Sequence, residues 1–188
     1  MKPFLIFPRP SSEGYTGPTT KKFFISPTAS GKISDDIFDW RYYVERGQNT
    51  LIVVPTTSLV EQMYKDFADY GWDVGSYCHK IYAGRERETD SQVIITTWQS
   101  IYKLPRKYFE RFNVVVGDEA HQFKSKSLIS IMSKLADAKY RFGFTGTLDG
   151  TQTHKWVLEG LFGPSYKIIR TEELMAKVML PLGINVFY

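Results

Sequence analysis

The 188-residue sequence contains a single cysteine, Cys78. One thiol cannot form an internal disulfide, and it excludes a metal site built from several cysteines. No apolar run approaches the roughly 18–20 residues that are needed to cross a bilayer. The first eight residues hold only four consecutive apolar side chains between prolines, which is too few for the core of a signal peptide. We therefore expect an intracellular, soluble protein of the cytoplasm, with no membrane partner.

A strong excess of either charge is also missing. Lysine and arginine number 24 against 20 aspartates and glutamates, which gives a net charge of +4. This mildly basic balance permits a polyanionic partner without requiring one. Hydrophobic residues make up 43% of the chain, which excludes a disordered or fibrous protein. The length fits one domain with a hydrophobic core of its own.

Residues 1–22 differ from the rest of the chain. They contain four prolines and two glycines and show no helical periodicity, which predicts an irregular N-terminal arm. From residue 23 to residue 188, short apolar runs alternate with amphipathic stretches. We predict strands at 23–25, 51–54, 93–96, 113–116 and 140–144, with a further possible strand at 184–188.

Helical spacing of apolar residues predicts helices over about 32–46, 59–67 and 128–135. Ser58 and Glu61 have the spacing of a capping box at the start of the second helix. Strands joined by helix-length connections indicate an α/β fold with a mainly parallel sheet between two helical layers. Ligands of such folds bind at the carboxyl ends of the strands, so the segments that follow each strand carry the functional interest.

A loop of small residues, Ser26 to Ile33, follows the first predicted strand. Such a loop between a strand and a helix directs backbone N–H groups at one anion, and Lys32 can reach terminal phosphates. It resembles the Walker A motif, with Ser26 in place of the first glycine and Ile33 in place of the Ser or Thr that binds Mg²⁺. Ser34 follows about 100° further around the helix. The candidate phosphate-binding residues are Pro27, Thr28, Ala29, Ser30, Gly31, Lys32, Ile33 and Ser34. The alternative is an ordinary helix-capping turn.

A pair of adjacent acids follows the fourth predicted strand in the segment Gly117-Asp118-Glu119-Ala120-His121. A carboxylate at a strand end, such as Asp118, can hold Mg²⁺, and Glu119 can accept a proton from an attacking water molecule. The alternative is a solvated acidic turn that caps the next element. Three valines followed by two acids in an α/β chain favour the catalytic interpretation.

With these residues as its DEAH box, the chain resembles the first motor lobe of a superfamily-two helicase. Five short motifs occur in the order of that superfamily. Beyond the two segments above, they are Pro55-Thr56-Thr57-Ser58-Leu59 with Gln62 (motif Ia), Thr96-Thr97-Trp98-Gln99-Ser100 (motif Ib) and Thr145-Gly146-Thr147 (motif III). The run Arg41 to Tyr43, followed by Val-Pro-Thr-Thr and Thr-Trp-Gln, is similar to phage recombination and repair helicases.

The resemblance implies a three-layer, RecA-like P-loop NTPase lobe that uses ATP and Mg²⁺. It gives catalytic roles to Lys32, Asp118 and Glu119, with Asp118 as the metal ligand, and it places His121 between the nucleotide and motif III. It also implies that Thr145, Gly146 and Thr147 couple the nucleotide site to the nucleic-acid site. The resemblance also implies a set of residues that contact the phosphate backbone of single-stranded or branched DNA. They are Pro55, Thr56, Thr57, Thr96, Thr97 and Gln99. The choice of DNA, and of a host cytoplasm, depends on the phage resemblance.

A second motor lobe, its arginine fingers and the family's adenine-sensing segment are not recognisable in the sequence. Such arginines contribute roughly 10³–10⁵ in rate in related phosphate chemistry. We therefore expect one lobe that hydrolyses ATP poorly alone, does not unwind a duplex, and works with a second lobe supplied in trans. A fragment, a split gene product or a degenerate copy would each have the motifs of one lobe without those of the second.

Two other functions remain open on the sequence. Ile33 is consistent with a non-hydrolysing nucleic-acid-binding module derived from a helicase lobe, and a small-molecule kinase would explain the Lys32 loop without the threonine motifs. Two basic stretches can lie along a phosphate backbone or form solvated faces. They comprise Lys103, Arg106, Lys107 and Arg111, and Lys124, Lys126, Lys134 and Lys139.

Overall fold

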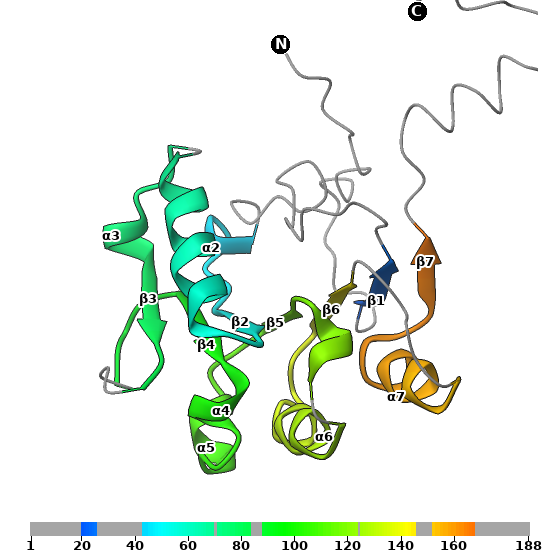
Figure 1. Cartoon of the computed structure of the whole chain (residues 1–188). Helices are drawn as coiled ribbons and strands as arrows, with labels where there is room; N and C mark the ends of the chain where they lie inside the picture. The colour runs from blue at the N-terminus through cyan, green and yellow to red at the C-terminus, as the bar shows by residue number, and fades with distance from the viewer. Residues whose placement is uncertain are drawn as a thin grey trace, which may run out of the picture.

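A computed structural model of the chain describes residues 20–25, 43–69, 71–83, 88–123, 125–145 and 152–167 (Figure 1). Several sequence predictions lie outside the described residues. They concern residues 1–19 of the arm, the loop 26–34, nearly all of the helix 32–46, Gly146, Thr147 and the strand 184–188. The first strand begins at Thr20, so the predicted boundary between arm and domain at residue 22 falls inside a strand.

Seven strands form one sheet in the order β3-β4-β2-β5-β6-β1-β7. Their bounds are β1 Thr20–Ile25, β2 Thr50–Val54, β3 Cys78–Ile81, β4 Val93–Thr97, β5 Val114–Gly117, β6 Tyr140–Thr145 and β7 Ser165–Lys167. Each pairing between these described strands is parallel. The predicted α/β class is therefore confirmed.

The sequence missed β3 and β7, which are the two edge strands of the sheet. The middle residues of β3, His79 and Lys80, are half-buried, whereas all five residues of the central strand β2 are buried. An edge strand has a neighbour on one side only, so it can carry polar residues and lacks the continuous apolar run that identifies a central strand.

The described helices are α2 Thr57–Asp69, α3 Val74–Tyr77, α4 Trp98–Ile101, α5 Arg106–Phe109, the 3₁₀-helix η1 Ala120–Gln122, α6 Ser125–Lys134 and α7 Gln152–Phe162. The predicted capping box of α2 is wrong. The Leu59 N–H donates to Thr56 Oγ1 over 3.3 Å, so Thr56 caps the helix two residues before Ser58. Glu61 instead pairs with Lys80 of β3 at 2.8 Å and fixes α2 to the edge of the sheet.

Helices cover both faces of the sheet. Leu51 and Val53 of β2 pack in a cluster that includes residues of α4, α5, α6 and α7, whereas Ile52 and Val54 pack in a second cluster with residues of α2. Figure 1 shows the first helix group along the lower side of the view and α2 with α3 at the upper left. This is the predicted three-layer arrangement. Among the described residues, no helix combines the length and apolar character that a membrane span requires.

Candidate functional site

Three neighbouring strands bring the candidate catalytic residues to one edge of the sheet. In the register of β5 and β6, Gly117 is opposite Gly143, and in the register of β6 and β1, Thr145 is opposite Ile25. Asp118 follows β5 directly, and the predicted phosphate loop starts where β1 ends. Since adjacent strands are about 4.8 Å apart, β5 and β1 are separated by roughly 10 Å, with the end of β6 between them.

The carboxyl group of Asp118 is held inside the protein, with only 4% of the residue exposed. Its backbone N–H donates to the Val53 carbonyl over 3.0 Å and extends the hydrogen bonding between β5 and β2. Asp118 Oδ1 accepts a hydrogen bond from the Glu119 N–H over 2.9 Å. Burial, with the nearby charge of Glu119, raises the pKa of Asp118 from 3.8 to about 7. Such a desolvated carboxylate is stabilised when a cation binds beside it.

The chain reverses direction sharply at Glu119. Its φ of 49° and ψ of 44° lie in the left-handed region, and it is the non-glycine residue with a positive φ in the part of the chain that the structure describes. This conformation costs a non-glycine residue roughly 1–2 kcal/mol. It ends β5 and starts η1, which places Asp118, Glu119 and His121 in one short turn. Outliers of this kind are concentrated at functional sites.

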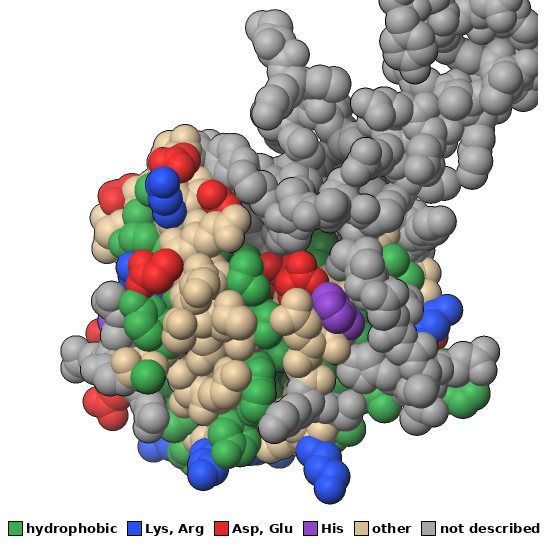
Figure 2. All heavy atoms as spheres, in the orientation of Figure 1, with side chains coloured by type: hydrophobic (Ala, Val, Ile, Leu, Met, Phe, Trp, Pro, Cys, Tyr) green, Lys and Arg blue, Asp and Glu red, His purple; other side chains and the backbone are tan. Residues whose placement is uncertain are grey.

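His121 connects this acidic turn to the end of β6. Its Nδ1 lies 2.6 Å from Thr145 Oγ1 and 3.3 Å from Glu119 Oε2. Thr145 is 3% exposed, so the bridge to it is largely shielded from water. Figure 2 shows a histidine beside acidic side chains on the face turned to the viewer. The structure thus joins the histidine of the predicted DEAH box to the first residue of the predicted motif III.

The donor set of the turn fits Mg²⁺. This ion prefers oxygen ligands and is usually held by one or two carboxylates together with substrate phosphates and water. Among the residues that the structure describes, no group of three or more His, Cys, Asp or Glu side chains could hold a metal by itself. Asp118 supplies one desolvated carboxylate, which suits an ion that arrives with a nucleotide.

The predicted nucleic-acid contacts divide into exposed and buried residues. Thr56, Thr57 and Gln99 are exposed, whereas Pro55, Thr96 and Thr97 are buried. The Thr96 hydroxyl donates to the Thr97 carbonyl over 3.2 Å, and Thr97 Oγ1 lies 2.8 Å from Ser100 Oγ.

The side chains of Thr96 and Thr97 are therefore hydrogen-bonded within the protein, and their contact with nucleic acid stays a prediction. They occupy the end of a central strand, where both faces of the sheet are covered by helices. Gln99 Nε2 donates to the Pro55 carbonyl over 3.3 Å and links motif Ib to motif Ia.

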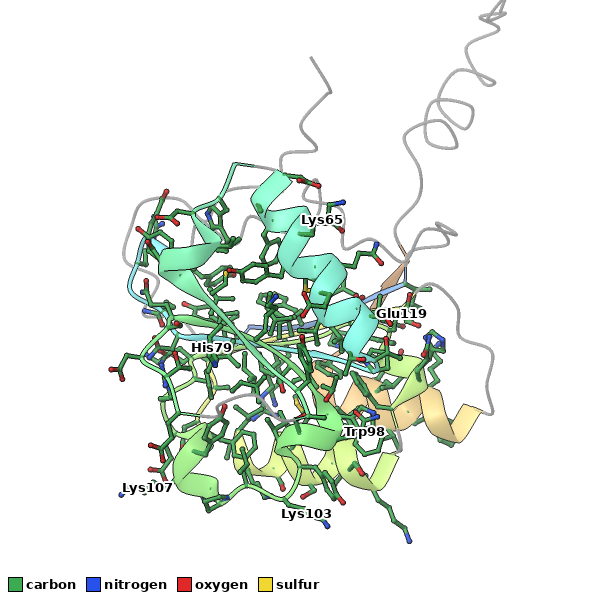
Figure 3. All side chains as sticks on the ribbon, turned by 60° about the vertical axis from the view of Figure 1, so that its left-hand side comes forward. Lys65, His79, Trp98, Lys103, Lys107 and Glu119 are labelled. Atoms are coloured by element: carbon green, nitrogen blue, oxygen red, sulfur yellow. The ribbon has the colours of Figure 1, made fainter. Side chains whose placement is uncertain are left out.

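The two basic stretches are used in part to hold the fold together. Arg106 pairs with Asp137 at 3.3 Å, and Lys134 Nζ donates to the Tyr102 carbonyl over 2.6 Å. The Arg111 guanidinium donates to carbonyls of the segment before β4. Figure 3 shows Lys103 and Lys107 at the lower end of the view, away from Glu119. Spacing along the sequence does not distinguish these internal roles from phosphate contacts.

Sequence reasoning also missed α7, which follows motif III. Leu158 and Phe162 are fully buried and four residues apart, and Gly163 ends the helix. That spacing and that glycine are the features that could have revealed the helix. Because α7 packs against η1, which follows the acidic turn, the sequence prediction lacked one of the elements that support the site.

The fold and the acidic turn are those of a RecA-like motor lobe, and the similarities reported below make it the first lobe of a superfamily-two helicase. The chain belongs to the ResIII family, described as "Type III restriction enzyme, res subunit", whose model matches residues 17–150.

Two curated relatives are similar over most of this chain. The ATP-dependent DNA helicase uvsW of Enterobacteria phage T4 is 34% identical over 79% of the chain and 31% of its own length. The DNA 3'-5' translocase XPB2 of Sulfurisphaera tokodaii is 29% identical over 74% of the chain and 30% of its own length. The chain thus spans about a third of the length of these relatives.

Solved structures have the same fold. The crystal structure of the T4 UvsW helicase superposes with a TM-score of 0.67 at 34% identity, covering 79% of this chain and 54% of that one. The helicase domain of Pyrococcus furiosus Hef superposes with a TM-score of 0.64 at 18% identity, covering 81% and 35%. The second likeness concerns the fold alone.

Proposed function

We propose that the chain binds ATP with Mg²⁺ at the edge formed by β1, β5 and β6, and that it is the nucleotide-binding lobe of a cytoplasmic DNA helicase or translocase of phage recombination or repair. The observation that carries the proposal is the buried Asp118 carboxylate, in one turn with Glu119 and His121 that is bonded to β6, the neighbour of the strand that leads into the Lys32 loop. A relative named as an ATP-dependent DNA helicase supports the same activity.

Each residue of the turn has a distinct role in this proposal. Lys32 and the backbone N–H groups of residues 28–34 hold the phosphates, with Pro27 at the start of the loop, and Asp118 holds Mg²⁺. When bound, the ion neutralises phosphate charge and aligns the terminal phosphate for attack. Glu119 takes the proton of the attacking water. His121, 3.3 Å from Glu119 and 2.6 Å from Thr145, keeps the base oriented and connects it to motif III.

In this proposal Thr145, Gly146 and Thr147 couple the nucleotide site to the nucleic-acid site. That site lies after β2 and β4, which are neighbours with Val54 opposite Thr97. Thr56, Thr57 and Gln99 are exposed there and can donate to phosphates of single-stranded or branched DNA without reading bases. Hydrolysis at full rate and unwinding require a second motor lobe in this proposal.

A binding titration tests the nucleotide site. We expect calorimetry of the chain with ATP to show affinity that depends on Mg²⁺, that is lost in Lys32→Ala and that is reduced about tenfold or more in Asp118→Asn. Lys107→Ala removes an exposed lysine outside the proposed site and is the matched control. Wild-type affinity in Lys32→Ala would contradict the proposed phosphate loop.

The second candidate is a nucleic-acid-binding module that does not hydrolyse ATP. Ile33, which cannot ligate a metal, is the observation that favours it. This function predicts weak nucleotide affinity that hardly changes with Mg²⁺, together with DNA affinity that falls steeply with salt. The same titration, repeated with a labelled DNA oligonucleotide at several salt concentrations, separates the two functions.

A further inference from the structure

Two glycines face each other across β5 and β6. Gly117 and Gly143 are register partners, and a Cβ at either position would collide with aromatic rings of the core. At Gly117 it would lie 2.8 Å from Phe162 Cζ, and at Gly143 it would lie 2.7 Å from Phe23 Cδ2 and 2.8 Å from Phe162 Cγ. The missing side chains leave a notch in the sheet, the glycine notch, which the Phe162 ring fills.

The end of α7 is also fixed to β1. Gly163 has a φ of +97°, and a Cβ there would lie 2.6 Å from the Lys21 carbonyl oxygen. The Phe23 N–H donates to the Pro164 carbonyl over 3.2 Å. The rings of Phe23 and Phe162 stack with their centroids 6.2 Å apart, and both residues are fully buried. The Phe162 ring, on α7, therefore contacts β5 and β6 and the aromatic ring of β1.

These are the strands that carry the proposed nucleotide site. Asp118 follows Gly117 directly, Thr145 lies two residues beyond Gly143, and β1 ends two residues beyond Phe23. Movement of the Phe162 ring would change the spacing of these strands and with it the distance between the acidic turn and the end of β1. Catalytic and binding groups tolerate displacements of only about 0.5 Å.

We infer that Phe162, seated in the glycine notch, is a positioning residue that sets the spacing between the acidic turn after β5 and the carboxyl end of β1. The inference rests on the proposed nucleotide site. Phe162 acts through the strands and has no contact with the reacting atoms in this role.

A volume exchange tests this role. Phe162→Leu empties part of the notch, and Gly117→Ala pushes against the ring, so each single variant is expected to lower the Mg²⁺-dependent affinity for ATP about tenfold. In the double variant the new methyl group occupies space that the shorter side chain leaves, and affinity is expected to return to within about threefold of the wild type. Phe109→Leu, at an equally buried phenylalanine of α5, is the matched control.

Thermal unfolding separates positioning from simple core packing. Phe162→Leu and Phe109→Leu are expected to lower Tm to a similar extent, while only the first weakens ATP binding. If both variants bind ATP like the wild type despite lower Tm values, Phe162 is an ordinary core residue and the inference is overturned. If the double variant binds no better than the single variants, the notch does not set the spacing.

Amide hydrogen exchange, measured by NMR without nucleotide, distinguishes failure of this inference from failure of the proposed function. The amides of Asp118 and Glu119 bond to Val53 and to the Asp118 carboxylate. They are expected to exchange faster in Phe162→Leu, to recover in the double variant and to be unchanged in Phe109→Leu. A wild-type chain that binds no ATP would refute the proposed site, and unchanged exchange in Phe162→Leu would refute the positioning role.

Discussion

The acidic turn after β5 and the first residues of the helices that follow β2 and β4 lie at the carboxyl edge of the same sheet, but they are built in opposite ways. The turn is charged and largely buried, has a left-handed residue at Glu119, and is bonded to β6 through His121. The starts of α2 and α4 present neutral, exposed groups at Thr57 and Gln99. Stabilising developing charge requires fixed, desolvated groups, whereas a partner of any sequence requires accessible donors to its backbone.

The largest expected difference between the acidic turn and the nucleic-acid region is at Glu119. We expect Glu119→Gln, in the chain reconstituted with a second lobe, to lower DNA-stimulated ATP hydrolysis by about 10²–10⁴, the usual contribution of a general base. Nucleotide binding should survive, because the amide keeps the size of the carboxylate. Thr57→Ala is the matched change at the other region and should alter hydrolysis by less than about threefold. An unchanged rate in Glu119→Gln would remove the catalytic role of the turn.

Burial of Asp118 predicts a stability that depends on pH. The pKa of its carboxyl group is raised from 3.8 to about 7 in the folded state. Its contribution to the free energy of unfolding is therefore complete below pH 3.8 and is lost as the pH rises through about 7. Over that window of about three pH units the loss approaches roughly 4 kcal/mol.

Asp118→Asn cannot ionise and still accepts the Glu119 N–H, so we expect it to unfold at a higher temperature than the wild type at pH 8. Thermal unfolding in EDTA at pH 5 and pH 8 measures this. The difference in Tm should grow with pH, and equal Tm values at pH 8 would show that the carboxylate is solvated.

The bridge between the acidic turn and β6 can be broken at Thr145. Thr145→Val keeps the shape of the side chain and removes the hydroxyl that lies 2.6 Å from His121 Nδ1. We expect a loss of about 1–2 kcal/mol in the free energy of unfolding, measured with a chemical denaturant. In a double-mutant cycle, Thr145→Val should cost little once His121 is alanine. Additive losses would mean that the two side chains are not coupled.

The smallest effect separates Thr56, the N-cap of α2, from Thr57, the first residue of that helix. Thr56→Ala removes the cap and should cost about 1 kcal/mol of stability. Thr57→Ala should leave Tm unchanged and weaken DNA binding a few-fold, equally for different sequences, in a fluorescence anisotropy titration. A clear sequence preference in that loss would contradict recognition of the DNA backbone at the start of α2.

Much of this fold could be predicted because its central strands are continuous apolar runs. Runs such as 51–54 and 93–96 need no partner to be recognised, and the polar residues that follow them mark the functional edge. The edge strands could not be predicted in the same way, since the middle residues of β3 are polar and half-buried and β7 is only three residues long. The cap of α2 was misassigned because Thr56, Thr57 and Ser58 are chemically similar, and only the backbone geometry selects one of them.

The candidate site was predictable in its chemistry and less so in its exposure. The sequence identified Asp118, Glu119 and His121 by type and order, and the structure brings His121 to Thr145. The sequence did not reveal that Thr96 and Thr97 are buried, because burial depends on helices that are distant along the chain.

The central strands and the chemistry at their ends follow from local sequence alone, because hydrophobic periodicity and side-chain type are properties of neighbouring residues. Tertiary structure decided which threonines and basic residues reach solvent and which are held inside. The tertiary structure also brings Gly117 and Gly143 together in the notch that the Phe162 ring fills. The physical reason is that exposure and close packing are fixed by contacts between segments that are remote in the chain, and no local pattern encodes those contacts.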